Sequence, residues 1–196
     1  MKTDTAIANE LRMRHSRTRE SVRHWCARAA TSSSVVRVFA KETKEDLLRV
    51  LLTIPVEAIS QLSGRENFEE WFETQLERVA RAIYKRNKTN VRVNPGLKWG
   101  HAAKVLALYL RDVVLHSRFL TDAEVARVAP WLFVPVDSKV MERLADLGVK
   151  LPFTQIRQIA SKDAFYRVQN MLANNCDPGI ARVVFDDVWA DRSPVA

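Results

Sequence analysis

A single aspartate, Asp137, is the residue of this chain whose setting most favours chemistry. It follows an apolar segment, residues 131–136, and comes just before a helical pattern that begins near Ser138. An aspartate in this place is commonly the N-cap of the helix that follows it. A lone carboxylate with apolar neighbours can also act as a general base or stabilise positive charge on a bound substrate. The sequence leaves both roles open for Asp137.

The second candidate feature is a stretch of basic residues that precedes Asp137. The 196-residue chain has a formal net charge of +8, and no aspartate or glutamate lies between Arg78 and Arg111. Positive charge this concentrated indicates a polyanionic partner, because phosphate contacts release counterions. The alternative is a solvated basic face without a partner. The basic residues of the stretch are Arg78, Arg81, Lys85, Arg86, Lys88, Arg92, Lys98, Lys104 and Arg111.

Several kinds of enzyme are disfavoured by what the sequence lacks. It has no glycine-rich phosphate-binding loop of the P-loop or dinucleotide type and no G-x-S-x-G motif. Its two cysteines, Cys26 and Cys176, are far apart, which gives neither a disulfide framework nor a metal-knuckle spacing. Its four histidines have no metal-ligand spacing: His15, His24, His101 and His116. We therefore expect neither a metal nor a cofactor.

The composition predicts an all-α, compact multi-helix protein. Apolar residues make up 47% of the chain and there are only five glycines, which favours helix over sheet. No apolar run is long enough to span a bilayer, and the start of the chain lacks the apolar core of a secretory signal. We expect a monomeric cytoplasmic protein without membrane contact. Its parts would be a basic N-terminal helix or arm, residues 1–34, and one helical domain, residues 35–196.

The spacing of apolar residues places the helices of that domain. The segment 99–115 is apolar around most of its circumference, which predicts a buried central helix. Thr121 and Glu124 form a capping signal for a helix that ends near Pro130. The other expected helices lie at 42–52, 68–85, 138–147, 154–173 and 183–189.

Two motifs in this region resemble those of the helix-hairpin-helix DNA glycosylase superfamily. The first resembles the family's hairpin, roughly L-P-G-V-G-P-K-T-A-x-x-V-L, and the second its V-P-V-D-x-H-V segment, which carries a catalytic aspartate. They occur in the family's order. The residues that carry the resemblance are Pro95-Gly96-Leu97-Lys98-Trp99-Gly100-His101-Ala102-Ala103-Lys104-Val105-Leu106 and Val134-Pro135-Val136-Asp137-Ser138-Lys139-Val140.

The resemblance implies a glycosylase-like fold with a hairpin at about 84–115 and an aspartate-bearing segment at 131–147. Asp137 would be the catalytic residue. Gly100 stands where bifunctional members have a lysine nucleophile, so the resemblance implies a monofunctional enzyme that uses Asp137 and a water molecule. Lys98 replaces the second glycine of the hairpin, and residues 117–130 resemble an inserted helix.

The resemblance also implies which residues would contact DNA, either duplex or single-stranded. Phosphates would be bound by Lys88, Arg92, Gly96, Lys98, Gly100 and Lys104. An extruded base would lie against aromatic side chains, with Trp99, Trp131, Phe133 and Trp189 as candidates. Aromatic residues at helical spacing more often belong to the core, and the sequence does not separate these two uses.

Three functions therefore remain open. The first is base excision, in which the N-glycosidic bond of a damaged or modified base is hydrolysed, in DNA repair or in defence against phage. Oxidised purines, alkylated bases and modified pyrimidines of the phage type are all possible substrates. The second is a catalytically silent helical protein that binds nucleic acid. The third is a helical interaction module with an acidic protein partner.

Overall fold

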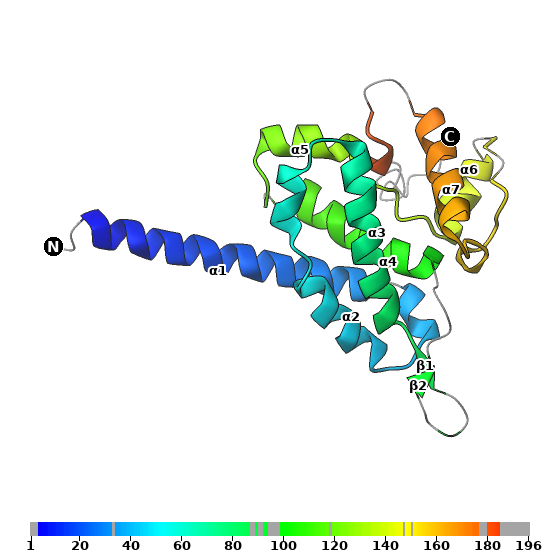
Figure 1. Ribbon diagram of the computed structural model, residues 1–196, viewed down its shortest axis with the longest axis horizontal. Helices are drawn as coiled ribbons and strands as arrows, with labels where there is room; N and C mark the ends of the chain where they lie inside the picture. The colour runs from blue at the N-terminus through cyan, green and yellow to red at the C-terminus, as the bar shows by residue number, and fades with distance from the viewer. Residues whose placement is uncertain are drawn as a thin grey trace.

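The computed structural model describes residues 4–32, 34–86, 89, 92–93, 99–117, 119–146, 148–149, 151–176 and 180–184. The fold is all-α, as the sequence predicts, with one very short antiparallel ribbon (Figure 1). The α-helices are α1 (Asp4–Thr31), α2 (Thr43–Leu52), α3 (Arg65–Ala82), α4 (Trp99–Arg111), α5 (Asp122–Val128), α6 (Ser138–Asp146) and α7 (Lys162–Asn174). Short 3-10 helices or π-turns are η1 (Ser34–Val38), η2 (Val56–Gln61), η3 (Asp112–His116), η4 (Ala129–Trp131) and η5 (Ile156–Gln158). The ribbon consists of β1 (Lys85–Arg86) and β2 (Arg92–Val93).

Helix α4 is the central helix of the molecule, and this prediction is confirmed. It contacts α1, α3, α7, η1, η3 and η5. Most of its side chains are buried, including Val105, Leu106 and Tyr109, none of which is exposed to solvent. Beyond Arg111 the helix continues as the π-turn η3, so the helical segment ends at His116. A helix that is covered on every side explains why its sequence is apolar around most of its circumference.

Helix α3 packs on α4 with an apolar stripe that includes Phe68, Phe72 and Leu76. It begins at Arg65 and ends at Ala82, three residues before the end expected from the sequence. It ends early because Ile83 is extended and Tyr84 binds the segment before α2. The Tyr84 carbonyl accepts hydrogen bonds from the backbone N–H of Ala40 and the hydroxyl of Thr43.

The connection from α3 to α4 differs from a simple helical hairpin. Strands β1 and β2 pair antiparallel, with Lys85 opposite Val93 and Arg86 opposite Arg92. Residues 95–98 of the hairpin-like motif lie outside the described residues. The predicted helix-hairpin-helix element therefore remains a prediction.

The second half of α1 belongs to the domain. Cys26, Ala27 and Ala30 are buried in the same core as α2 and α4. Arg23 donates a hydrogen bond of 3.0 Å to the hydroxyl of Tyr109 and another to the carbonyl of Ile54. The first half of α1 extends away from the body (Figure 1). None of the helices among the described residues is long and apolar enough to cross a membrane.

Candidate functional site

The extended segment that leads to Asp137 is held by side chains from the end of the chain. Gln169 of α7 accepts a hydrogen bond from the Val134 N–H at 3.0 Å and donates one to the Val134 carbonyl at 2.9 Å. Arg182 donates to the carbonyls of Leu132 and Trp131 at 2.9 and 3.0 Å. Gln169 is fully buried and Arg182 nearly so. These side chains satisfy backbone groups of a segment that pairs with no strand among the described residues, and thereby fix the position of Asp137.

Arg182 is an unusual group for this position. Its guanidinium lies 4.4 Å from the centroid of the Phe133 ring. Burial lowers the pKa of Arg182 to about 10, and the positive charge of Arg65 adds to this effect. The carbonyls and the aromatic ring replace part of the water that the cation loses on folding.

Asp137 caps helix α6, which confirms the N-cap role that the sequence left open beside a catalytic one. Its Oδ1 accepts a hydrogen bond of 3.0 Å from the backbone N–H of Val140, and its carbonyl accepts one from Met141. Its Oδ2 lies 2.5 Å from the Nζ of Lys104, with which it forms an ion pair. The Asp137 side chain is 25% exposed and that of Lys104 only 7%.

The position of Lys104 corrects its predicted role as a phosphate contact. Lys104 lies on the central helix, where neighbouring elements cover its side chain and prevent the ammonium from reaching bulk solvent. A buried ammonium needs an opposite charge close to it, and Asp137 provides one. Lys104 is therefore the ion-pair partner of Asp137, and its buried ammonium is not placed to bind a phosphate.

Gly100 is also engaged inside the protein. Its backbone N–H donates a hydrogen bond of 2.8 Å to the carbonyl of Ile159. A Cβ atom added at Gly100 would lie 2.3 Å from the carbonyl oxygen of Ile156. The glycine therefore allows η5 to approach the start of α4, and its amide is not available to a phosphate. Of the other expected phosphate contacts, Arg92 lies on β2 and its side chain is outside the described part of the structure, as are Lys88, Gly96 and Lys98.

The aromatic residues expected to surround a base belong mainly to the core. Phe133 is 1% exposed and meets Phe72 edge to face, with ring centroids 4.6 Å apart. Trp99 is half-buried against Phe165, with 6.4 Å between centroids. Trp131 is half-buried beneath Arg127, whose guanidinium is 5.3 Å from the ring centroid. Trp189 lies outside the described residues. Packing therefore accounts for Phe133 fully and for the two tryptophans in part.

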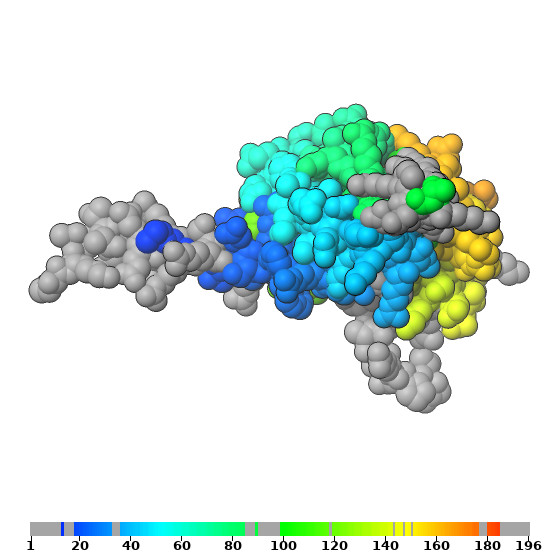
Figure 2. Space-filling view, turned by 90° about the horizontal axis from the view of Figure 1, so that it is seen from below, coloured from blue at the N-terminus to red at the C-terminus, as the bar shows by residue number. Residues whose placement is uncertain are grey.

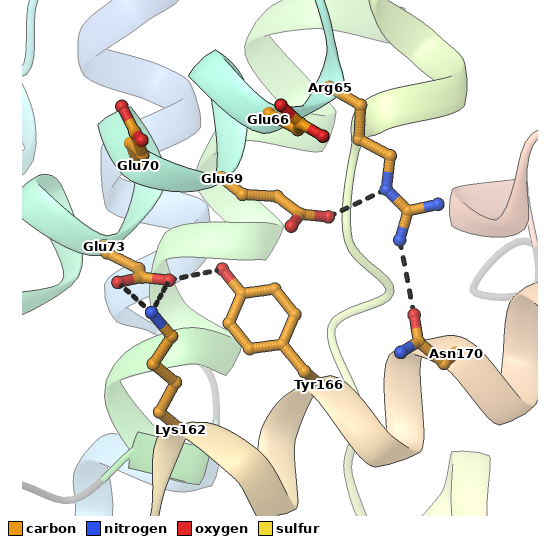
Figure 3. A pocket seen from close by; sticks show the side chains of 8 residues that line it. All are labelled: Arg65, Glu66, Glu69, Glu70, Glu73, Lys162, Tyr166 and Asn170. Atoms are coloured by element: carbon orange, nitrogen blue, oxygen red, sulfur yellow. Dashed lines mark hydrogen bonds and ion pairs between the residues drawn. The ribbon is translucent and has the colours of Figure 1, made fainter.

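A pocket of about 650 Å³ between α3 and α7 was not anticipated from the sequence (Figure 3). Lys162 and the hydroxyl of Tyr166 both contact the carboxylate of Glu73, at 2.8 and 2.9 Å. Arg65 contacts Glu69 at 2.7 Å. The i, i+3, i+4, i+7 spacing of its glutamates was the sequence signal that could have revealed this acidic face. The residues that line the pocket are Arg65, Glu66, Glu69, Glu70, Glu73, Lys162, Tyr166 and Asn170.

Two of the four glutamates of this acidic pocket, Glu69 and Glu73, are paired with cations that also line it. Burial raises the pKa of Tyr166, and the hydrogen bond to Glu73 raises it further. The same carboxylate raises the pKa of Lys162. Figure 3 shows these side chains reaching from α7 toward the glutamates of α3. The contacts join α7 to α3, so they help to hold the helix that carries Gln169.

Neither a metal site nor a known relative identifies the chain. Within the described residues, no group of three or more His, Cys, Asp or Glu side chains could hold a metal ion. The chain matches no family model, no curated protein and no solved structure. The Lys104–Asp137 pair and the distribution of charge are therefore the grounds on which a function can be argued.

Proposed function

We propose that the protein binds nucleic acid and hydrolyses the N-glycosidic bond of a damaged or modified base, with Asp137 as the catalytic carboxylate. The observation that carries this proposal is the contact between Lys104 and Asp137. Lys104 lies in the hairpin-like motif and Asp137 in the second motif, 33 residues later. This contact joins one residue of each motif, which supports joint action of the two motifs at one site.

The setting of Asp137 is suitable for this chemistry. Cleavage of an N-glycosidic bond builds positive charge on the sugar, and a nearby carboxylate stabilises that charge or deprotonates the attacking water. The N-cap bond and the ion pair fix the orientation of the carboxylate, while a quarter of the side chain remains exposed. The base must also leave its stack, at a cost of a few kcal/mol.

A specific observation favours a second candidate, a nucleic-acid-binding protein without catalysis. Both carboxylate oxygens of Asp137 already have structural partners, Val140 on one side and Lys104 on the other. These contacts account for an aspartate at this position even if no substrate ever meets it. Under this second candidate, Asp137 matters for folding alone.

A base-excision assay separates the two candidates. Single-stranded and duplex DNA carrying oxidised, alkylated, deaminated or hypermodified bases would be incubated with the protein and then treated with alkali to reveal abasic sites. Excision by the wild type that is lost in Asp137→Asn, with DNA binding retained, would support the enzyme. Asn can still cap α6, so this substitution removes the charge with little change of shape. The control is Ser138→Ala at the exposed neighbouring residue, which should excise normally.

A double-mutant cycle shows whether loss of activity reflects chemistry or folding. Asp137→Asn leaves the Lys104 ammonium buried without its partner, at a cost of about 1–3 kcal/mol given the partial exposure of Asp137. In Lys104→Met/Asp137→Asn the unpaired ammonium is gone, so part of this stability should return. Excision that returned together with stability would show that the Asp137 carboxylate is dispensable. DNA binding without abasic sites on any substrate would support the silent binding protein.

A further inference from the structure

A second pocket, of about 510 Å³, lies between the end of α1 and the start of α2, and we call it the basic pocket. Arg37, Lys41 and Lys44 line it together with the hydroxyl residues Thr31 and Ser32 and the ring of Phe39. None of the described residues that line it is acidic. Glu42 and Glu45 alternate with the lysines along the chain but do not line the pocket. The pocket therefore presents positive charge to whatever occupies it.

The three cations of the basic pocket lack internal counter-charges. Arg37, Lys41 and Lys44 are exposed, and none of the hydrogen bonds or ion pairs formed by side chains in the described part of the chain involves them. In the acidic pocket, by contrast, Arg65 and Lys162 are each paired with a glutamate. Like charges that converge without a counter-charge repel one another, and a bound anion would relieve that repulsion.

An anion in the basic pocket would be bound by side chains and not by backbone N–H groups at a helix terminus. The backbone N–H groups at the start of α2 are already bonded, that of Thr43 to the carbonyl of Ala40 and that of Glu45 to the carbonyl of Glu42. The hydroxyl of Thr31 donates to the carbonyl of Arg28. Three flexible cationic side chains around one cavity suit a phosphate group, which accepts hydrogen bonds in many directions.

The basic pocket lies close to the Lys104–Asp137 pair. Phe39, which lines the pocket, meets the ring of His101 edge to face, with centroids 5.3 Å apart. His101 precedes Lys104 by three residues on α4, which is about 4.5 Å along the helix axis. Ala40 is bonded to Tyr84, the residue before the basic strand β1. Residues that line the pocket thus contact both the segment just after α3 and the helix that carries Lys104, and Figure 2 shows α2 on the face viewed from below.

We propose that the basic pocket binds a backbone phosphate of the nucleic acid whose base is presented to Asp137. The preference for phosphate follows from the pocket itself. That the phosphate belongs to a nucleic acid rests on the proposed function. Neither Arg37, Lys41 nor Lys44 belongs to the motifs, so the pocket adds a contact that the sequence pattern does not contain.

The test compares two triple variants by fluorescence anisotropy with a labelled DNA oligonucleotide, single-stranded and duplex, over a range of salt concentrations. The first variant is Arg37→Gln/Lys41→Gln/Lys44→Gln. The control is Arg49→Gln/Arg157→Gln/Arg167→Gln, which removes three positive charges that are exposed and outside the pocket. Each variant lowers the net charge equally, so a general charge effect would appear in both.

We expect the pocket variant to bind DNA about 10-fold more weakly or worse near 0.1 M salt. The slope of log affinity against log salt should fall by about 1 for the loss of one phosphate contact. The control should stay within about twofold of the wild type, because its three charges do not line the pocket. Equal losses in both variants would overturn the proposal, and so would an unchanged slope in the pocket variant.

The same variants distinguish this proposal from the proposed function. Normal DNA binding by the pocket variant, with excision that depends on Asp137, would support the proposed enzymatic function and contradict phosphate binding in the basic pocket. Weak DNA binding by the pocket variant, with no excision by any form of the protein, would support phosphate binding in the basic pocket and contradict the proposed enzymatic function. If the wild type binds no DNA, the phosphate source is wrong. Calorimetry with pyrophosphate would then show whether free phosphates bind in the pocket. That binding should be lost in the pocket variant and retained in the control.

Discussion

At the scale of single residues, Gly100 shows how one missing methyl group permits a close contact in the fold. The start of α4 and the loop at η5 approach each other so closely that a Cβ on Gly100 would lie 2.3 Å from a carbonyl oxygen. The opposing atom belongs to the backbone and cannot rotate away as a flexible side chain would. One of the two chain segments must therefore move if any other residue stands here.

We expect Gly100→Ala to destabilise the protein by about 1–3 kcal/mol, the usual cost of overpacking a tight site. For a domain of this size, the melting temperature should fall by roughly 3–10 °C. The matched control is Gly64→Ala, since a Cβ at Gly64 would meet nothing within 4 Å. Thermal unfolding followed by circular dichroism checks both variants. Equal melting temperatures for the two would mean that α4 and η5 do not pack as closely as described.

Cys26 gives the protein a pH-dependent contribution to stability. Its thiol is fully buried, and burial, together with the negative charge of Asp112, raises its pKa from 9.0 to about 11. The unfolded thiol ionises near pH 9, whereas the folded one keeps its proton. The unfolded state therefore binds fewer protons in this window, and stability falls as the pH rises from about 9 to 11.

We expect the difference in unfolding free energy between the wild type and Cys26→Ala to be constant below pH 9 and to shrink above it. The loss by pH 11 should be on the order of 2 kcal/mol, because each pKa unit corresponds to about 1.4 kcal/mol. Urea unfolding at a series of pH values measures this difference. Because all other titrating groups are present in both proteins, their contributions cancel in the comparison. A difference that stays constant up to pH 11 would contradict the assigned shift.

At the scale of elements, Gln169 replaces a neighbouring strand for the extended segment before Asp137. One carboxamide forms both hydrogen bonds with Val134, as a paired strand would. Both atoms of Val134 and the whole Gln169 side chain are buried, so none of these groups can turn to water instead. The position of Asp137 thus depends on the docking of α7, which the contacts of Glu73 with Lys162 and Tyr166 support.

We expect Gln169→Leu to cost about 2–4 kcal/mol, since it leaves a buried N–H and a buried carbonyl without partners. The Val134 amide should also exchange with deuterium much faster than in the wild type. The control, Asn170→Leu, changes the exposed neighbour, which only accepts a 3.3 Å bond from Arg65. Urea unfolding and hydrogen exchange give the two readouts. A Val134 amide that stays protected in Gln169→Leu would show that the segment does not need this side chain.

The elements also show what the sequence could reveal and why the rest was hidden. Apolar spacing correctly predicted the central helix, and Thr121 forms the capping box that its pattern with Glu124 indicated. Asp137 is an N-cap, as its position suggested. These features depend on neighbouring residues in the chain. The burial of Lys104, in contrast, depends on elements that cover α4 from distant parts of the sequence.

Other features were hidden for the same reason. The β1–β2 ribbon has two residues in each strand, which is too short for an alternating pattern to be recognised. The clamp formed by Gln169 links residues 35 positions apart. The basic pocket requires the end of α1 to lie beside the start of α2, which only the fold establishes. Local patterns predicted helices and caps, but not which charged side chains would be covered.

At the scale of the whole molecule, α1 has two different halves. The second half contributes Cys26, Ala27 and Ala30 to the core, and Arg19 donates a 3.1 Å hydrogen bond to the carbonyl of Phe119. The first half projects from the body (Figure 1). The boundary between the two halves, not the end of the helix, therefore separates the projecting part of α1 from the part that packs in the core.

We expect a protein that lacks residues 2–17 to fold normally, with a melting temperature within about 3 °C of the wild type. A protein that lacks residues 2–31 should fail to fold cooperatively, because it loses buried apolar surface from the centre of the domain. Thermal unfolding of both truncations checks this. A large loss of stability in the shorter truncation would show that the projecting half packs against the body.

The arrangement of charge along α3 has a consequence for how the protein would meet a partner. Glu66, Glu69, Glu70 and Glu73 occupy its first half, whereas Arg78 and Arg81 lie near its end. This separation gives α3 a charge dipole along its own axis. In the field of a polyanion, that dipole would favour orientations in which the basic end of α3 leads and the acidic pocket trails, before any contact forms. Productive encounters would then be frequent in dilute buffer and rarer as added salt shortens the reach of that field.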